Sequence, residues 1–480
     1  MIAYSIQEIK NAEKEIIESG VSEEVLIDRA SDCLYNVVKN YTGMKVFLVG
    51  GGNNGSDALA CAIKIKDKVK IYIANVKRNA INSLLLQKAS KIHEVLPLTD
   101  FNGEGDVIID GLFGSGLSRE LGEEICNALK IANDSNAYRI AIDIPSGLDD
   151  LGLAKPIAFC AHETVVLGGV KESNILNDAP DYCNKLTVCD IGLNLKGGTK
   201  VINEKSVSIP KRKRNTHKGK YGKIKIVGGS ERYVSAPLFS ALSCLRTGAG
   251  LTTLTIPNSL KYFYSLSSHY GYTLDFLPEN EKGVVFCTSK ANEIISNATT
   301  IVVGMGMGDN EVTAKYVEYF INNFDGILVI DADGINALSK NVEMLKSTNR
   351  KAKIILTPHI GEYGRLNSNS DLRPFKVKEW AKANDVVMVL KSSTSIITDG
   401  ESVSVSVVGT PALAKGGSGD ILAGIIGALT SITDRKIAVE TACVLLGLGG
   451  KIASEKAGNE SSVIPLDIIN SIGDAITKLQ

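Results

Sequence analysis

The amino-acid sequence predicts an α/β protein with two domains, each built around a largely parallel sheet. Short runs rich in β-branched residues alternate with helical patterns along both halves of the chain, which indicates βαβ units. The 480 residues are enough for two or three domains with large cores. The 46 glycines, against one tryptophan, indicate many tight turns of the kind found in glycine-rich ligand loops.

The first predicted domain covers residues 1–205. A helical pattern extends from Asn11 to Asn40, and five strands are expected after it. These strands are Lys45–Val49, Lys70–Ala74, Asp106–Asp110, Arg139–Ile144 and Glu163–Leu167. Glycine or proline loops follow them, and ligands of parallel sheets bind beyond the carboxyl ends of the strands.

A change of pattern marks the domain boundary near residue 205. The polar stretch 196–210 is followed by a basic run, which has seven Lys or Arg residues in 211–223. Such a run either binds phosphate or RNA or forms a solvated linker, and the linker is favoured in a protein without net charge.

The second predicted domain covers residues 211–480. Its expected strands are Lys223–Val227, Leu251–Ile256, Thr300–Val303, Gly326–Ile330, Lys353–Leu356, Val386–Leu390, Ser395–Thr398 and Val403–Val407. The apolar, small-residue segments Ile421–Leu429 and Ala438–Ala453 are expected to form buried helices.

The composition excludes several classes of function. Lys plus Arg and Asp plus Glu both number 53, so neither nucleic acid nor an acidic membrane is an expected partner. No uncharged apolar stretch reaches the roughly 18 residues that span a bilayer. The nine cysteines form no C-x-x-C motif and the five histidines are dispersed, so we expect reduced thiols in a cytoplasm, without a disulfide framework or a His-based metal site.

The loop Gly50–Asp57 lies between an expected strand and an expected helix. It has G-x-G-x-x-G spacing, but no acidic residue follows at about 20 positions, and Ser56 replaces the lysine of a P-loop. The remaining interpretation is a turn that offers backbone N–H groups and a helix N-terminus to an anion. A simple strand–helix turn does not require the polar side chains of Asn53, Asn54 and Asp57, so their presence favours a binding role.

Two further loops of this half begin with an aspartate at a strand end. They are Asp110–Leu117, DGLFGSGL, and Asp143–Asp149, DIPSGLD. Such a carboxylate either binds a cation or acts as a base, or it only caps its own loop. The three loops converge on one edge of the sheet, which favours a functional site over simple loop capping.

The motifs GGGNNGSD, DGLFGSGLSRE and AIDIPSGLD together resemble the epimerase domain of the NAD(P)H-hydrate repair enzymes. The resemblance implies a Rossmann-like three-layer αβα fold, a damaged dinucleotide as ligand and a bound potassium ion. It assigns potassium to Asn54, Asp110 and Ser146, and the reacting ring to Asp143. The implied nucleotide-binding residues are Asn53, Asn54, Gly55, Ser56, Asp57, Gly114, Ser115, Gly116, Leu117, Ser118, Arg119, Glu120 and Asp143. The family usually has glycine at the positions of Ser56 and Ala58, so their side chains are expected to weaken ligand binding.

The second half has its own ordered set of motifs: IVGGS at 226–230, RTGAGL at 246–251, VGMGMG at 303–308, TPHIGE at 357–362 and KGGSGD at 415–420. The last lies between a strand and an apolar helix, so its N–H groups suit an anion hole. Asp420 either deprotonates a hydroxyl there or caps the helix. His359 is either a ligand contact or an ordinary loop histidine.

This second set resembles the NAD(P)H-hydrate dehydratase branch of the ribokinase-like fold, over about residues 210–480. The resemblance implies that Ala236, Gly306, Gly308, His359 and Asp420 face the hydrated nicotinamide nucleotide. It also implies that Lys391, Ser392, Ser393, Thr394, Ser395 and Gly419 bind ADP.

The combined interpretation is a two-domain metabolite-repair enzyme, both an isomerase and a lyase. The first domain would interconvert the R and S epimers of hydrated NADH or NADPH (NADHX, NADPHX), and the second would phosphorylate the S hydroxyl so that phosphate loss restores the nucleotide. The resemblance implies Asp420 and Asp143 as catalytic residues, potassium and magnesium ions as cofactors, ADP or ATP as co-substrate, and a homo-oligomer. The alternatives are a ribokinase-like kinase that makes a stable phosphate, and a first domain that only senses nucleotides or serves as a scaffold.

Overall fold

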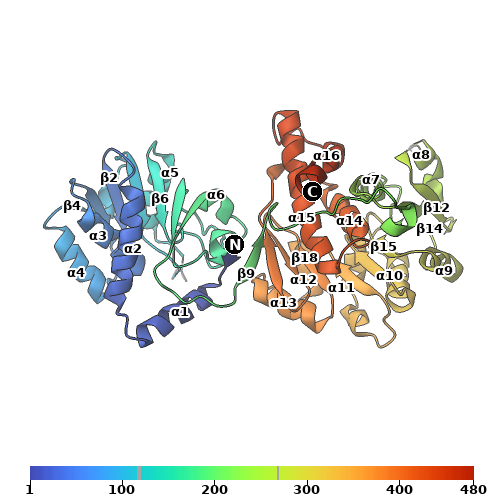
Figure 1. The fold of residues 1–480 in the computed structure, drawn as a ribbon, viewed down its shortest axis with the longest axis horizontal. Helices are drawn as coiled ribbons and strands as arrows, with labels where there is room; N and C mark the ends of the chain where they lie inside the picture. Colours follow the sequence, from blue (N-terminus) through green and yellow to red (C-terminus); the bar gives the residue numbers. More distant parts are fainter. Residues whose placement is uncertain (116–119, 267–269) are drawn as a thin grey trace. The chain divides into compact units, whose positions relative to one another are not determined.

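The computed structural model describes residues 1–115, 120–266 and 270–480, and the chain forms two compact units, Met1–Lys200 and Val201–Gln480. Each unit has an α/β architecture built on a largely parallel sheet (Figure 1). The predicted fold class is therefore confirmed. The sequence pattern places the boundary at 205, whereas the first unit ends at Lys200.

The sheet of the first unit has the order β4-β3-β2-β5-β6-β7-β8, with parallel pairing throughout. Its strands are β2 (Lys45–Val49), β3 (Lys70–Ile73), β4 (Glu94–Pro97), β5 (Val107–Gly111), β6 (Tyr138–Ile142), β7 (Glu163–Leu167) and β8 (Lys185–Cys189). The chain leaves β2 toward one edge and returns to its other side at β5. The loops after β2 and β5 therefore flank the switch point, where such sheets bind ligands.

Helices cover both faces of this sheet. In β2, Phe47 and Val49 pack in one core cluster with α2 and α3, whereas Val46 and Leu48 pack in another with α5. This alternation is what a strand buried on both faces requires. The helices are α1 (Ile6–Glu18), α2 (Glu23–Val38), α3 (Asn53–Lys64), α4 (Ala80–Ala89), α5 (Glu123–Asp134) and α6 (Ala179–Cys183).

The single helix expected over 11–40 is wrong, because the structure has two helices there. Helix α1 ends at Glu18, Gly20 adopts a φ of 104°, and Ser22 precedes α2 in an extended conformation. A left-handed glycine stops a helix without steric cost. The N-terminal strand β1 (Ile2–Ala3), which the pattern did not predict, pairs antiparallel with Thr199 and Lys200 at the start of β9 (Thr199–Ile202).

The sheet of the second unit runs β9-β20-β19-β18-β17-β16-β15-β10-β11-β12. Strands β10 to β12 and β15 to β18 are parallel, and β19 and β20 add antiparallel strands. The strands are β10 (Lys223–Val227), β11 (Leu251–Pro257), β12 (Thr273–Leu277), β15 (Thr300–Val303), β16 (Ile327–Ile330), β17 (Lys353–Leu356), β18 (Val387–Leu390), β19 (Ser395–Thr398) and β20 (Val403–Ser406), with a separate hairpin of β13 (Glu279–Asn280) and β14 (Gly283–Val284). The switch point lies between β10 and β15.

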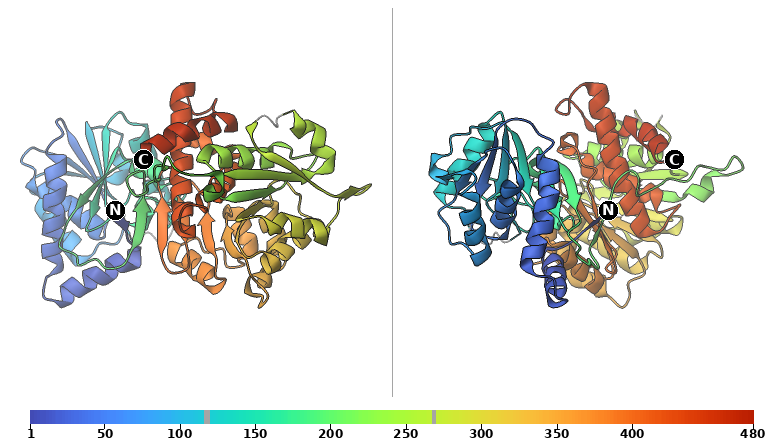
Figure 2. Two further views of the ribbon diagram at one scale, coloured as in Figure 1. Left: turned by 45° about the vertical axis from the view of Figure 1, so that its right-hand side comes forward. Right: turned by 60° about the vertical axis from the view of Figure 1, so that its left-hand side comes forward.

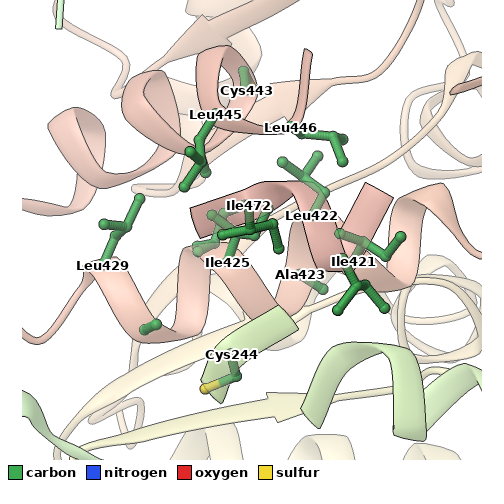
Figure 3. Close-up of a cluster of buried hydrophobic side chains, with 14 of the residues drawn as sticks. Cys244, Ile421, Leu422, Ala423, Ile425, Leu429, Cys443, Leu445, Leu446 and Ile472 are labelled. Atoms are coloured by element: carbon green, nitrogen blue, oxygen red, sulfur yellow. The ribbon is translucent and has the colours of Figure 1, made fainter. Parts of the chain in front are cut away.

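Helices lie on both faces of this sheet, with α7 and α14 to α16 on one side and α10 to α13 on the other (Figures 1 and 2). Helix α14 lies among α7, α15 and α16, and its Ile421, Leu422 and Ile425 meet apolar side chains such as Leu446 and Ile472 (Figure 3). The helices are α7 (Ser235–Thr247), α8 (Lys261–Ser265), α9 (Thr288–Ser296), α10 (Glu311–Asn323), α11 (Asp333–Ser339), α12 (Ile360–Leu366), α13 (Pro374–Ala383), α14 (Ser418–Leu429), α15 (Arg435–Ala457) and α16 (Pro465–Lys478).

Helix α15 is the one helix in the described residues that is long and apolar enough to cross a membrane. Most of it is buried inside the second unit, as expected of a core helix. The polar stretch 196–210, which precedes the basic run, also contributes to this core, because Ile202 and Ile209 are buried in it and Ile209 N donates to the Leu479 carbonyl.

Candidate active sites

A cavity of about 490 Å³ in the first unit lies at the switch point of its sheet. Loops after β2, β5, β6 and β7 meet helices α1 and α2 around it. The described residues that line it are Lys10, Glu13, Ile17, Glu23, Leu26, Ile27, Ala30, Gly51, Gly52, Asn53, Asn54, Asp57, Val76, Lys77, Leu112, Phe113, Gly114, Ser115, Asp143, Leu167, Lys171 and Ile191.

The glycine loop after β2 brings the N-terminus of α3 to this cavity. Gly52 precedes the helix without a side-chain cap, so the first N–H groups of this 12-residue helix are available to an anion. A Cβ on Gly50 would lie 1.8 Å from the Leu112 carbonyl oxygen, so only glycine allows this approach of the two loops. Asn53, Asn54 and Asp57 line the cavity as the sequence predicts.

Ser56 and Gly55 are not among the described lining residues. Ser56 is fully buried, and its hydroxyl donates to the Gly52 carbonyl of its own helix. Ala58 is also fully buried, and a Cβ placed on Gly111 would lie 2.6 Å from the Ala58 Cβ. Both added side chains therefore point into the protein and leave the cavity surface unchanged.

An oxygen-rich cluster joins the loops after β2, β5 and β6. The Ser146 hydroxyl donates to Asp110 at 2.7 Å, Ser146 N donates to the same carboxylate at 2.8 Å, and Asn54 Nδ2 donates to the Phe113 carbonyl at 2.6 Å. Burial raises the pKa of Asp110 to about 6, against the lowering effect of hydrogen bonds from Ser146 and Leu112. Asp110, Ser146 and Asn54 thus come together, with the hard oxygen ligands that an alkali or alkaline-earth cation takes.

Asp143 lies at the end of β6 with a φ of 65°. This left-handed conformation costs a non-glycine residue about 1–3 kcal/mol and persists only when neighbours fix it. The Asp143 carboxylate accepts hydrogen bonds from Leu167 N and the Lys171 ammonium, and Asn174 Nδ2 donates to the Asp143 carbonyl at 2.9 Å. The carboxylate is thus held at the cavity wall.

Gly114 and Ser115 line the cavity, and Glu120 is exposed. The predicted nucleotide contacts Gly116, Leu117, Ser118 and Arg119 lie outside the described residues. The sequence missed five charged lining residues, namely Lys10, Glu13, Glu23, Lys77 and Lys171. The only sequence signal for Lys171 is its place just beyond a strand end, and Glu13 lies on a helix that carries no motif.

In the second unit, a buried ion pair marks the carboxyl ends of β16 and β18. Asp331 accepts hydrogen bonds from Lys391 Nζ at 2.7 Å and from the Thr357 hydroxyl at 2.6 Å. Lys391 N also donates to the Pro358 carbonyl at 2.8 Å, which joins the loop after β17 to the loop after β18. Lys391 was predicted as an ADP contact, whereas Asp331 had not been singled out.

Asp420 lies beside this pair in the first turn of α14. Gly417 is the N-cap residue, with a φ of 105° and no side-chain cap, so Asp420 is not the cap of this helix. Burial raises the pKa of Asp420 to about 7; the Asp331 charge adds to the increase and the Lys391 charge opposes it. The neighbouring Gly419 is close to the lysine, since a Cβ there would lie 3.2 Å from Lys391 Nζ.

His359 has a structural role as the cap of α12. Its Nδ1 accepts hydrogen bonds from Gly361 N at 3.0 Å and Glu362 N at 3.3 Å, and His359 N donates to the Glu362 carboxylate at 2.8 Å. Burial lowers the pKa of His359, and Lys391 and Arg365 lower it further. The backbone of His359 forms a β-bridge with that of Lys391, and its imidazole is about half exposed, so the side chain can still contact a ligand.

Ala236 and the glycines after β15 lie together at the second switch point. A Cβ on Gly306 would lie 3.4 Å from the Ala236 Cβ and 2.6 Å from the Tyr233 Cβ. Gly308 N donates to Asp333 at 2.8 Å. Ser392, Ser393, Thr394 and Ser395 form the turn from β18 to β19, where the Ser392 hydroxyl donates to the Thr394 carbonyl.

No group of three or more His, Cys, Asp or Glu side chains that could hold a metal ion occurs in the described ranges 1–115, 120–266 and 270–480. Magnesium is usually held by one or two carboxylates together with substrate phosphates. Among the carboxylates near Lys391, Glu362 is one that would supply such a ligand.

Comparison with known proteins identifies both units. Residues 23–173 match the model of the YjeF-related protein N-terminus, and residues 224–473 match that of NAD(P)H-hydrate dehydratase. A ribokinase-like protein from Enterococcus faecalis and an ADP/ATP-dependent NAD(P)H-hydrate dehydratase from Bacillus subtilis share the fold of the second unit. Their TM-scores are both 0.51 at 21% and 24% identity, and the matches cover 60% and 59% of this chain and 98% and 99% of theirs.

Relatives also match along nearly the whole chain. The bifunctional NAD(P)H-hydrate repair enzyme of Thermofilum pendens is 30% identical over 99% of this chain and 96% of its own length. The enzyme of the same name from Archaeoglobus fulgidus is 30% identical over 96% of this chain and 95% of its own. The chain therefore belongs to the family of bifunctional NAD(P)H-hydrate repair enzymes.

Proposed function

We propose that the second unit dehydrates the S epimer of hydrated NADH or NADPH with ADP or ATP as phosphoryl donor, and that the first unit interconverts the R and S epimers. The observation that carries the proposal is Asp420, a partly buried carboxylate in the first turn of an apolar helix, beside a lysine. A pKa near 7 suits a general base at neutral pH.

The chemistry at Asp420 follows from its position. Asp420 takes the proton of the substrate hydroxyl as that oxygen attacks the terminal phosphorus of the donor, and the shorter nucleotide leaves. The uncapped N–H groups of α14 stabilise the charge that develops on the phosphoryl oxygens. The ring nitrogen then expels phosphate, and loss of a proton from the neighbouring ring carbon restores the dihydropyridine.

The remaining assignments divide the site between its two ligands. Ala236, Gly306, Gly308 and His359 contact the hydrated nucleotide. Lys391, Ser392, Ser393, Thr394, Ser395 and Gly419 bind ADP, with the Lys391 ammonium directed at its phosphates. A magnesium ion would supply further charge neutralisation for the donor phosphates, and Glu362 is the carboxylate that would hold it.

In the first unit, the cavity accommodates the dinucleotide. Its phosphates approach the N-terminus of α3 through Asn53 to Asp57, and Gly114 to Glu120 bind the same nucleotide. Asn54, Asp110 and Ser146 hold a potassium ion, whose charge fixes the loops after β2, β5 and β6. Asp143 contacts the reacting ring. Epimerisation measured in sodium and in potassium buffers tests the ion, since sodium should support a lower rate.

The repair activity has a direct test. The purified full chain is incubated with mixed NADHX epimers, with and without ADP, and the recovery of NADH absorbance is followed. We expect complete recovery with ADP and none without it. A stable phosphorylated product in place of NADH would overturn the dehydratase and favour a small-molecule kinase.

Cellular context completes the proposal. All nine cysteines are free thiols, which fits a reducing cytoplasm. We propose a cytoplasmic homo-oligomer with small-molecule substrates only and without nucleic-acid or membrane partners. Light scattering after size-exclusion chromatography tests the oligomeric state, and a monomer would contradict it.

A further inference from the structure

Among the charged groups of the first cavity that the proposed nucleotide and potassium sites do not use are Glu13 and Lys171. Glu13 reaches the cavity from α1, and Lys171 from the loop after β7. They line the same volume of about 490 Å³ as Asp57 and Asp143, together with the charged side chains of Lys10, Glu23 and Lys77. Such a set offers both a proton donor and a proton acceptor.

Lys171 is fixed on every side. Its side chain is 1% exposed, and its ammonium contacts the Asp143 carboxylate and donates to the Leu167 carbonyl at 2.6 Å. Lys171 N donates to Asn174 Oδ1, and the side chain of that same asparagine donates to the Asp143 carbonyl. An adjacent ammonium favours the charged form of a carboxylate. Lys171 therefore fixes the position of Asp143.

Glu13 has the opposite environment. Burial raises its pKa, and the charge of Asp143 adds to the increase, as does that of Glu23 on α2. Lys171 and Lys10 oppose it. Asp57 on α3 faces the same group, and its own pKa is raised well above the usual range, first by burial and then by Asp143 and Glu13. Glu13, whose pKa is raised, and Asp143, which contacts an ammonium, are therefore suited to be an acid and a base.

We propose that Glu13 is the acid and Asp143 the base of epimerisation, and that Lys171 is the positioning residue that assigns these roles. The inference rests on the proposed epimerase function. The reacting carbon bears both the hydroxyl and the ring nitrogen. Glu13 gives its proton to the hydroxyl, the C–O bond breaks with its electron pair on the departing water, and the nitrogen lone pair forms a C=N bond.

Water then adds to the opposite face of the ring. Its oxygen forms the new C–O bond, the C=N electron pair returns to nitrogen, and Asp143 takes the proton that the water loses. The product has the inverted configuration, and one proton has moved from Glu13 to Asp143. Exchange with solvent restores both groups. The hydroxyl oxygen of the product therefore comes from water.

The first experiment measures epimerisation by the full chain without ADP or ATP, so that the second unit consumes nothing. Glu13→Gln should lower the rate by about 10²-fold, the usual effect of losing an acid. It should also remove the fall of the rate at high pH, because that fall reports deprotonation of Glu13. Glu18→Gln, an exposed position of the same helix, is the matched control. Dehydration of the S epimer, measured separately with ADP, should not change.

The second experiment separates positioning from folding. Lys171→Met removes a charge that lowers the pKa of Glu13, so the fall of the rate at high pH should move to higher pH. Lys171→Arg keeps the charge and should restore the wild-type profile in part. If Lys171→Met lowers the thermal midpoint, the arginine variant still reports the role of the charge. Equal profiles for wild type and both variants would overturn the role of Lys171.

The third experiment uses H₂¹⁸O. Each epimerisation should place ¹⁸O in the hydroxyl of the product, and retention of the original oxygen would overturn the proposed bond breaking. A loss of the high-pH limb in Asp57→Asn but not in Glu13→Gln would assign the acid to Asp57 and overturn the inference. If the wild-type chain does not interconvert the epimers at all, the epimerase proposal itself fails. If it does and Glu13→Gln equals Glu18→Gln, only the inference fails.

Discussion

Each unit contains a buried lysine–aspartate pair beyond its parallel strands, and the two pairs serve different purposes. In the first unit Lys171 contacts Asp143, the carboxylate assigned to catalysis. In the second unit Lys391 pairs with Asp331 at 2.7 Å, and burial raises the pKa of the neighbouring Asp420 to about 7. A lysine can thus hold a catalytic carboxylate in place, or pair with one carboxylate while a neighbouring one stays ready to accept a proton.

The comparison predicts the largest effect at Asp420. Asp420→Asn keeps the size of the side chain and does not alter the cap of α14, which is Gly417, but an amide cannot accept the substrate proton. Turnover of S-NADHX with ADP should fall by about 10² or more. The free energy of unfolding should change by about 1 kcal/mol or less, because no cap is lost. Turnover, ADP affinity and melting temperature are measured on one preparation, and near-normal turnover would refute the role of Asp420.

The second prediction concerns Asp143. Asp143→Asn leaves Lys171 buried without a charged partner and removes the base, so epimerisation should fall by about 10²-fold. Dehydration of the S epimer should stay unchanged, since Asp143 belongs to the other unit. Asp150→Asn, an exposed position in the loop that follows, is the control. Equal losses of both activities would mean that the two units do not divide the work.

The third prediction tests the second pair through the pH dependence of dehydration. Asp420 acts as a base, so the rate should rise with pH and level off above a midpoint near 7. Asp331→Asn removes a negative charge that raises the pKa of Asp420, so the midpoint should move to lower pH. A shift of one unit corresponds to about a tenfold change of relative rate below the midpoint.

The control for that profile is Asp325→Asn, an exposed position just before β16, at the end of that strand opposite Asp331. It should leave the midpoint unchanged. A midpoint that stays fixed in Asp331→Asn as well would show that the rate does not report the ionisation of Asp420.

The last prediction concerns the stretch between the two units, whose removal should lower stability and leave the dehydration activity in place. A chain that starts at Lys211 lacks Ile202 and Ile209, which are buried in the core of the second unit. Each buried isoleucine contributes about 1.5–3 kcal/mol, so this chain should unfold at lower denaturant than one that starts at Thr199. A chain that starts at Lys205 keeps Ile209 and should be intermediate. Each should convert S-NADHX with ADP and leave R-NADHX to its slow spontaneous reaction.

The sequence by itself determined the α/β class and most central strands, because a strand buried on both faces is a short, continuous apolar run. Edge strands such as β1 and β4 gave no such signal, since they are short or partly exposed. The glycine loops at strand ends were also predictable. Glycine at Gly50 is required by a backbone contact that no other residue permits.

The partners of the catalytic carboxylates were decided only by the tertiary structure. Lys171 follows Asp143 by 28 positions and Lys391 follows Asp331 by 60, and each pair forms because nearby strands end at the same edge of a sheet. Glu13 reaches the cavity because α1 packs beside it, and a helical pattern does not specify what its faces meet. The positions of the loops and of their polar residues can be predicted from local sequence. Charge pairing and burial, which set the pKa of Asp420, depend on contacts between distant segments.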